Sequence, residues 1–302
     1  SATRFREHGG YAAGGFLGAA PPAVVAVAVD EEQGAATAFL PALARGLGED
    51  VKRLVFEFAR PRAQIATSGG VPAETVLLGP RRQRCNFHGH TRRVRGLRFS
   101  PLGDWAITWS EDDFAIIWDV PSCSPRHFAR SGSVVQTATA FPAGDRAVTL
   151  SKNGAGVVWD VASGSAVASW ETAWGGGPIV KRGVVVFPAG DRLLMWDWMP
   201  LGIILNASSA QVICELRGHR SLISTAEIFP RGHRAITGGL DYTAFVWNTS
   251  SCEALHRLEH QDWVTGVYVL HGGGTVVTLT DAASVFVWSA GTGSLLRRLP
   301  LE

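Results

Sequence analysis

Apolar and polar residues alternate along this chain in short segments, which is the pattern of β-strands that bury one face. Clear examples are residues 95–99, 106–109 and 115–118. Turns rich in proline and glycine separate such segments, as at residues 100–104 and 141–145. The pattern predicts an all-β chain made of small antiparallel meanders.

A tryptophan closes an apolar strand in four of these meanders. The interval from Trp118 to Trp159 equals the interval from Trp247 to Trp288. The interval between Trp159 and Trp247 is about twice as long and leaves room for one more unit. A period of about 40–45 residues, into which the shorter interval falls, is typical of arrays of four-stranded blades. We therefore predict a repeat architecture.

The four tryptophans stand in one register within their units. In every unit the tryptophan follows the opening apolar residue at one constant interval. It follows a threonine at a second constant interval. The opening residues are Val94, Val135, Ile223 and Val264, and the threonines are Thr108, Thr149, Thr237 and Thr278. This shared register predicts that the four units have the same fold.

The unit between Trp159 and Trp247 departs from the pattern. Trp196 follows Asp191 much more closely than Trp159 follows Asp145. The interval from Asp145 to Trp159, counted from Asp191, reaches Leu205. We therefore expect Trp196 in a second strand and Leu205 in the place of the repeated tryptophan.

Residues 16–40 and 53–78 fit the same template loosely, which brings the expected number of units to seven. We predict one domain over residues 1–302. The expected units are residues 1–50, 51–88, 89–130, 131–172, 173–217, 218–259 and 260–302.

Several short motifs resemble those of WD-repeat β-propellers. They are Gly89-His90, Gly218-His219, the Pro-x-Gly-Asp turns, Trp118-Asp119 and Trp159-Asp160. The resemblance covers residues 88–302 well and the earlier residues only by pattern. It implies an all-β, seven-bladed β-propeller of four-stranded antiparallel blades.

The resemblance also implies a hydrogen-bonded set of histidine, threonine, aspartate and tryptophan inside a blade. The positions match completely in two units, as His90, Thr108, Asp112 and Trp118, and as His219, Thr237, Asp241 and Trp247. Other units lack a member, with Asn153 or Ala282 in place of the aspartate. We interpret the sets as structural and not catalytic, because they repeat and would be closed off between strands.

By the same resemblance, partner-binding side chains flank the opening residue of a unit or precede its turn aspartate. Candidates are Arg93, Arg95, Glu111, Gln136, Lys152, Leu222, Leu240, Trp263, Thr265 and Asp281. Trp263 is the leading candidate for a binding hot spot, because tryptophan and arginine dominate interface energetics. The cluster of Trp170, Trp174, Trp196 and Trp198 reads as core packing, with a side-surface interface as the alternative.

The formal net charge of +2 gives the whole chain no bias toward nucleic acid or an anionic membrane. Arginines are nevertheless dense between Arg81 and Arg98, where they form either a solvated strand edge or a contact for phosphate or acidic peptide. The longest apolar run, residues 23–29, is far shorter than the roughly 20 residues of a transmembrane helix. We expect no membrane insertion.

The remaining candidate chemistry is sparse. Cys85, His88 and His90 fall short of a closed zinc site, and residues 175–177 lack the lysine of a phosphate-binding loop. Four cysteines in separate repeats, Cys85, Cys123, Cys214 and Cys252, indicate no disulfide framework and hence a reducing compartment. We predict an intracellular protein, in the cytoplasm or in an organelle after removal of a transit peptide, with no metal, cofactor or small-molecule substrate.

Residues 3–8 and 294–299 both read as fourth strands, and the chain begins at Ser1 without methionine. We therefore expect it to be part of a longer polypeptide or a tightly incorporated subunit. The predicted function is a non-enzymatic scaffold that binds other proteins in a multiprotein complex. The alternative is a structural subunit of a ribonucleoprotein that contacts RNA phosphate through Arg81–Arg98.

Overall fold

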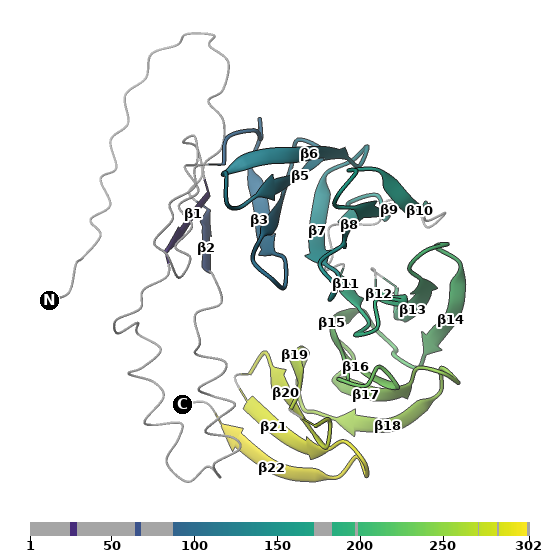
Figure 1. The fold of residues 1–302 in the computed structure, drawn as a ribbon. Coiled ribbons are helices and arrows are strands. Elements are labelled where there is room, and N and C mark those ends of the chain that lie inside the picture. The colour runs from purple at the N-terminus through teal and green to yellow at the C-terminus, as the bar shows by residue number, and fades with distance from the viewer. Residues whose placement is uncertain are drawn as a thin grey trace, which may run out of the picture.

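Five four-stranded antiparallel sheets form most of the described part of the chain. The computed structural model describes residues 25–28, 64–67, 87–171, 183–196, 199–270, 272–282 and 284–300. All regular elements in these residues are strands. The sheets follow one another around an arc, with the first strand of each on the inner side and the fourth on the outer side (Figure 1).

In every sheet the strands pair in chain order. The first two sheets contain β3 (Val94–Phe99), β4 (Trp105–Ser110), β5 (Phe114–Asp119) and β6 (Ser124–Arg130), then β7 (Val135–Ala140), β8 (Arg146–Ser151), β9 (Gly156–Asp160) and β10 (Ala166–Trp170). The third contains β11 (Gly183–Val186), β12 (Arg192–Trp196), β13 (Leu201–Asn206) and β14 (Val212–Arg217). The last two contain β15 (Ile223–Ile228), β16 (Arg234–Gly239), β17 (Thr243–Asn248) and β18 (Ala254–Glu259), then β19 (Val264–Val269), β20 (Thr275–Thr280), β21 (Ser284–Ser289) and β22 (Leu295–Pro300).

The hydrophobic core lies between neighbouring sheets. One apolar cluster joins β4 and β5 to β7, β8 and β9, and another joins β16, β17 and β18 to β19, β20 and β21. All the residues of β4 are buried, whereas most residues of the fourth strand β6 are not. Burial on both faces of the second and third strands explains why these strands read as nearly continuous apolar runs.

The predicted register is confirmed in the structure. Val94, Val135, Ile223 and Val264 are the first residues of β3, β7, β15 and β19 and are all buried. Trp196 ends the second strand β12, and Leu205 lies in the third strand β13 opposite Leu193. Trp159 lies opposite Ala147 in the same way, so Leu205 occupies the place of the repeated tryptophan.

The described members of the tryptophan cluster pack in the core. Trp196 is buried, and Trp170 packs against the apolar cluster formed by β8, β9 and the third sheet. Trp174 and Trp198 lie outside the described residues. Core packing therefore holds for Trp170 and Trp196.

Tight turns with a glycine at a fixed position join the first and second strands of each four-stranded sheet. Gly103, Gly144, Gly190, Gly232 and Gly273 all have positive φ values, between 70° and 76°. In each turn the glycine amide donates to the carbonyl three positions earlier, as from Gly144 to Phe141 at 2.9 Å. Glycine adopts this left-handed conformation without steric cost, which explains its recurrence.

The same turns are linked across sheet boundaries. The indole of Trp105 donates to the Gly144 carbonyl at 2.8 Å, and the Arg146 guanidinium donates to the Gly190 carbonyl at 2.8 Å. Arg192 and Arg234 reach the carbonyls of Gly232 and Gly273, each at 3.3 Å. Each of these sheets therefore holds the turn of the next one.

Two short strands precede the five sheets. β1 (Val25–Ala28) and β2 (Gln64–Thr67) pair antiparallel with each other, and β2 contacts β3. The sequence placed these strands in two different units, 1–50 and 51–88. The rest of both units lies almost entirely outside the described residues, which hold five four-stranded sheets.

The fourth strand of the last sheet comes from the C-terminal segment, because β22 pairs with β21. The predicted strand at residues 294–299 is therefore confirmed. The competing segment, residues 3–8, lies outside the described residues. No helix in the described part of the chain is long and apolar enough to cross a membrane.

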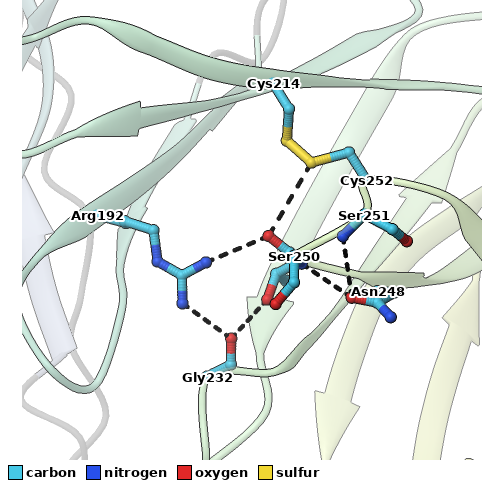
Figure 2. Close-up of a disulfide and its surroundings, with 8 residues drawn as sticks. Arg192, Cys214, Gly232, Asn248, Ser250, Ser251 and Cys252 are labelled. Atoms are coloured by element: carbon cyan, nitrogen blue, oxygen red, sulfur yellow. Dashed lines mark hydrogen bonds between the residues drawn. A yellow bond between two sulfur atoms is a disulfide. The ribbon is translucent and has the colours of Figure 1, made fainter.

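The expectation that the cysteines stay unpaired is wrong. Cys214 of β14 and Cys252, in the turn after β17, form a disulfide between neighbouring sheets, with Cα atoms 6.2 Å apart (Figure 2). Cys123 is also disulfide-bonded. Positions about one repeat apart lie across a sheet boundary, so a sequence separation of 38 brings two cysteines together. The bridge removes the basis for predicting a reducing compartment, and the location itself stays a prediction.

The cysteine spacing held a signal that was missed. Cys85 and Cys123 are separated by the same sequence interval as Cys214 and Cys252, and each pair stands in the same register to its His-Trp repeat. Figure 2 shows that the turn holding Cys252 also receives Arg192, whose guanidinium donates to the Thr249 carbonyl at 3.2 Å. The disulfide and the arginine therefore both connect the β11–β14 sheet to the turn after β17.

Candidate functional site

The first hydrogen-bonded set lies inside the β3–β6 sheet. Trp118 Nε1 donates to Thr108 Oγ1 at 2.8 Å, and Thr108 Oγ1 lies 2.7 Å from His90 Nε2. His90 Nδ1 is 2.9 Å from Asp112 Oδ2. Because the Asp112 carboxylate can only accept, the Nδ1 proton points to it, and in a neutral imidazole Nε2 then accepts from the threonine hydroxyl.

The second set, inside the β15–β18 sheet, has nearly the same dimensions. Trp247 Nε1 donates to Thr237 Oγ1 at 2.8 Å, and this oxygen lies 2.8 Å from His219 Nε2. His219 Nδ1 is 3.0 Å from Asp241 Oδ2. The structure thus joins all the residues that the sequence assigned to the two sets.

The aspartates of both sets remain ionised. Burial acts to raise the pKa of Asp112, but hydrogen bonding and charge interaction with His90 and backbone amide donors outweigh it and leave this pKa below its usual value. The same balance, with a further hydrogen bond from Thr243, lowers the pKa of Asp241. In each set, hydrogen bonds from the histidine and from backbone amides thus stabilise the ionised carboxylate.

A third set lacks its aspartate. In the β19–β22 sheet, Trp288 Nε1 donates to Thr278 Oγ1 at 2.9 Å, and His260 Nε2 lies 2.7 Å from the same oxygen. Ala282 stands where the other sets have aspartate. Burial lowers the pKa of His260 from 6.5 to about 4, against the effect of hydrogen bonds to backbone groups. This histidine is therefore neutral at pH 7.

Acid is expected to weaken the fold through His260. In the folded state His260 binds a proton only near pH 4, whereas in the unfolded state it binds one near pH 6.5. The stabilising contribution is therefore full above pH 6.5 and falls as the pH drops toward 4. The loss is on the order of 3 kcal/mol. Histidine NMR titration and urea unfolding at pH 7 and pH 4.5 measure both effects.

Ala282→Asp is the matched variant for this titration. A carboxylate beside the imidazole should raise the pKa of His260 by roughly 1 unit or more and reduce the loss of stability in acid. If His260 titrates near 6.5 in the unaltered protein, or if Ala282→Asp leaves its pKa unchanged, this account of the third set is wrong.

The predicted partner-binding residues gather on one face of the sheets. We call this the entry face; it consists of the loops from fourth to first strands and from second to third strands. Backbone bonds join the two kinds of loop, as from the Glu111 amide to the Arg93 carbonyl at 3.0 Å and from the Asp281 amide to the Trp263 carbonyl at 3.0 Å. The opposite face, with the glycine turns, is called the turn face.

In four sheets a β-bulge lies at the start of the first strand, next to the entry face. In β3 the pairing steps from Val94 to Gly96, which leaves Arg95 as the extra residue. Gln136 and Thr265 are the extra residues of β7 and β19, and β15 has the same shift. Bulges redirect side chains and are frequent beside functional sites. Arg95, Gln136 and Thr265 thus lie where the backbone departs from regular pairing.

The polar candidates differ in their environment. Arg95 forms an ion pair with Glu111 at 3.0 Å, with both side chains about one third exposed. Arg93, Lys152 and Asp281 are exposed, whereas Gln136, Leu222, Leu240 and Thr265 are half-buried. The candidates therefore share the entry face but differ in exposure and charge.

Two large side chains are exposed on the entry face. Trp263 is 45% exposed and Tyr242 is 48% exposed. The Tyr242 carbonyl accepts from the His260 amide at 2.8 Å, just before Trp263, so the two aromatic residues flank one sheet boundary. The other exposed large apolar side chains of the described residues lie on fourth strands or, for Leu102, on the turn face.

Tyr242 was missed by the sequence analysis. It follows the set member Asp241 and has a φ of 65°, which is unusual for a bulky residue. Its position in the repeat, directly after the turn aspartate, would have identified it as a loop residue on the entry face.

The described residues contain no group of three or more histidines, cysteines or acids arranged to hold a metal ion. The imidazoles of His90 and His219 are buried and fully engaged in their sets. These groups link the loop before the first strand to the second and third strands of their own sheet.

Two segments of the chain, residues 81–119 and 210–248, match the family model of the WD domain, G-beta repeat. Each match ends at the residue after a set tryptophan, Trp118 or Trp247, and includes one complete set. The comparison with curated proteins found no match.

Proposed function

We propose that this chain, which belongs to the WD-repeat family, is a non-enzymatic scaffold that binds another protein through its entry face. WD repeats generally mediate protein–protein interactions. The observation that carries the proposal is the exposed pair Tyr242 and Trp263, held at one sheet boundary by backbone hydrogen bonds.

The local structure suits a preorganised binding site. The Trp263 backbone is fixed on both sides, because its amide donates to Asp262 at 2.7 Å and its carbonyl accepts from Asp281. Half-buried Leu222 and Leu240 belong to the neighbouring loops of the β15–β18 sheet, where the Leu240 amide donates to the Leu222 carbonyl at 2.8 Å. A rigid aromatic anchor loses little conformational entropy on binding.

Trp263→Ala should weaken partner binding at least about 30-fold while leaving the fold intact, since truncation of a hot-spot tryptophan costs about 2 kcal/mol or more. Affinity capture from the source cells with quantitative mass spectrometry identifies the partner, and its affinity is then measured with purified components. Phe128→Ala, on the outer strand β6 and 57% exposed, is the matched aromatic control. A partner retained equally by Trp263→Ala and Phe128→Ala would refute the assignment of the entry face.

We further propose that the described sheets belong to a seven-bladed ring in a larger assembly. Two units of about 40–45 residues fit the stretch before the first complete sheet, residues 1–86. The contact of β2 with β3 supports a further blade at that side of the arc.

The ribonucleoprotein alternative has less support. Among the described arginines of Arg81–Arg98, Arg95 is paired with Glu111 and Arg98 also has a partner. Arg92 and Arg93 remain exposed. The described residues hold four exposed arginines of this stretch, one of them paired with Glu111, and these are few beside the roughly 6–10 phosphate contacts of a typical nucleic-acid-binding protein. Protein binding therefore accounts better for the described surface.

A further inference from the structure

A pocket of about 160 Å³ lies on the turn face between the β15–β18 and β19–β22 sheets. Its lining consists of Phe229, Pro230, Arg231, His233, Arg234, Gly272 and Gly273. Two arginines and a histidine are thus brought together, and none of these lining residues is acidic.

The equivalent turns of two other sheets, called the sister turns, differ from the pocket turn in charge. They read Phe-Pro-Ala-Gly-Asp-Arg at residues 141–146 and 187–192, whereas residues 229–234 read Phe-Pro-Arg-Gly-His-Arg. In the sister turns the aspartate lies 3.4 Å from the arginine that follows it, as Asp145 does from Arg146. His233 replaces that carboxylate, and Arg231 adds a second guanidinium. The turn keeps its shape but loses its neutralising charge.

Arg234 is held in place at the pocket. Its guanidinium lies over the Phe229 ring, 4.7 Å from the centroid, and donates to the carbonyls of Ala290 at 2.7 Å and Gly273 at 3.3 Å. Further N–H donors of the guanidinium remain for a ligand, and neither of these acceptors is a carboxylate. A fixed cation without a neutralising carboxylate is therefore part of the pocket wall.

The other two basic side chains have no competing partner. Arg231 and His233 are exposed, and within the described part of the chain their side chains form no hydrogen bond or ion pair. The opposite wall is formed by Gly272 and Gly273, and a Cβ atom added at Gly272 would meet nothing within 4 Å. Access to the basic groups is therefore open.

We propose that this turn-face pocket binds a single phosphate group. A phosphate has three oxygens for separate donors from Arg231, His233 and Arg234, and its charge of nearly −2 matches an arginine pair better than a lone carboxylate does. The small volume suits one group and not an extended polyanion. The site lies opposite the entry face and does not depend on the function proposed for that face.

The test is titration of the whole chain with inorganic phosphate and with a phosphoserine peptide, followed by NMR and calorimetry. Saturable binding that shifts the amides of residues 231–234 and 272–273 is expected. Arg231→Ala with His233→Asp, which restores the sister-turn chemistry, should weaken it at least about tenfold. Arg297→Ala, at an exposed cation on the outer strand β22, should leave it unchanged.

The two probes distinguish the source of the phosphate. Tighter binding of the peptide than of the free ion indicates a phosphorylated partner, and equal binding indicates a free phosphate ligand. The proposal is overturned if neither probe saturates, if the double variant binds as well as the unaltered chain, or if RNA binds there more tightly than either probe. Arg231→Gln alone serves as the second variant should the double variant melt early.

Discussion

Replacing Trp247 by alanine is expected to lower the free energy of unfolding by about 3–5 kcal/mol, the range for a buried large aromatic residue. Trp247 has no exposed surface and stacks on Phe245 with ring centroids 5.1 Å apart. Its loss leaves a cavity in the apolar cluster between the β11–β14 and β15–β18 sheets and deprives Thr237 Oγ1 of the donor at 2.8 Å. Urea unfolding followed by circular dichroism measures the change.

Two tryptophan-site variants separate the causes. Trp247→Phe keeps most of the ring but removes the indole donor, and it should cost about 1–2 kcal/mol. Trp263→Ala, at the exposed tryptophan of the entry face, should stay within about 0.5 kcal/mol of the unaltered protein. A cost for Trp247→Ala no larger than that for Trp263→Ala would contradict the role of the buried set.

Loss of the disulfide between Cys214 and Cys252 should destabilise the folded chain by about 4 kcal/mol, as the loop-closure entropy for a sequence separation of 38 implies. The bridge ties β14 to the turn after β17, and that turn also receives Arg192. The double variant Cys214→Ser, Cys252→Ser removes the bridge selectively. A reductant is not used, because it would also reduce the disulfide of Cys123. Urea unfolding under oxidising conditions gives the difference.

The single and double cysteine variants provide the control. Either single substitution already breaks the bond, so the double variant should cost little more than each single variant. Thiol labelling of the native protein should find no free thiol at Cys214 or Cys252. Additive costs of the two single variants, or ready labelling of both cysteines, would show that the bridge does not form.

The sequence by itself determined the strands and their pairing within a sheet. The repeat period, the opening apolar residues and the buried threonines identified the units. The count from Asp191 separated Trp196 in β12 from Leu205 in β13. Pairing within a sheet joins residues at short and constant separations, so a repeated pattern along the chain is enough to predict it.

Contacts between sheets were decided by the tertiary structure. The sequence was interpreted as lacking disulfides, and only the placement of β14 beside the next sheet joins Cys214 to Cys252. Tyr242 comes to the same boundary as Trp263, and on the turn face Arg231 lies beside the glycine turn of the next sheet. Such contacts depend on how one repeat is rotated against the next, and a period along the chain does not specify that rotation.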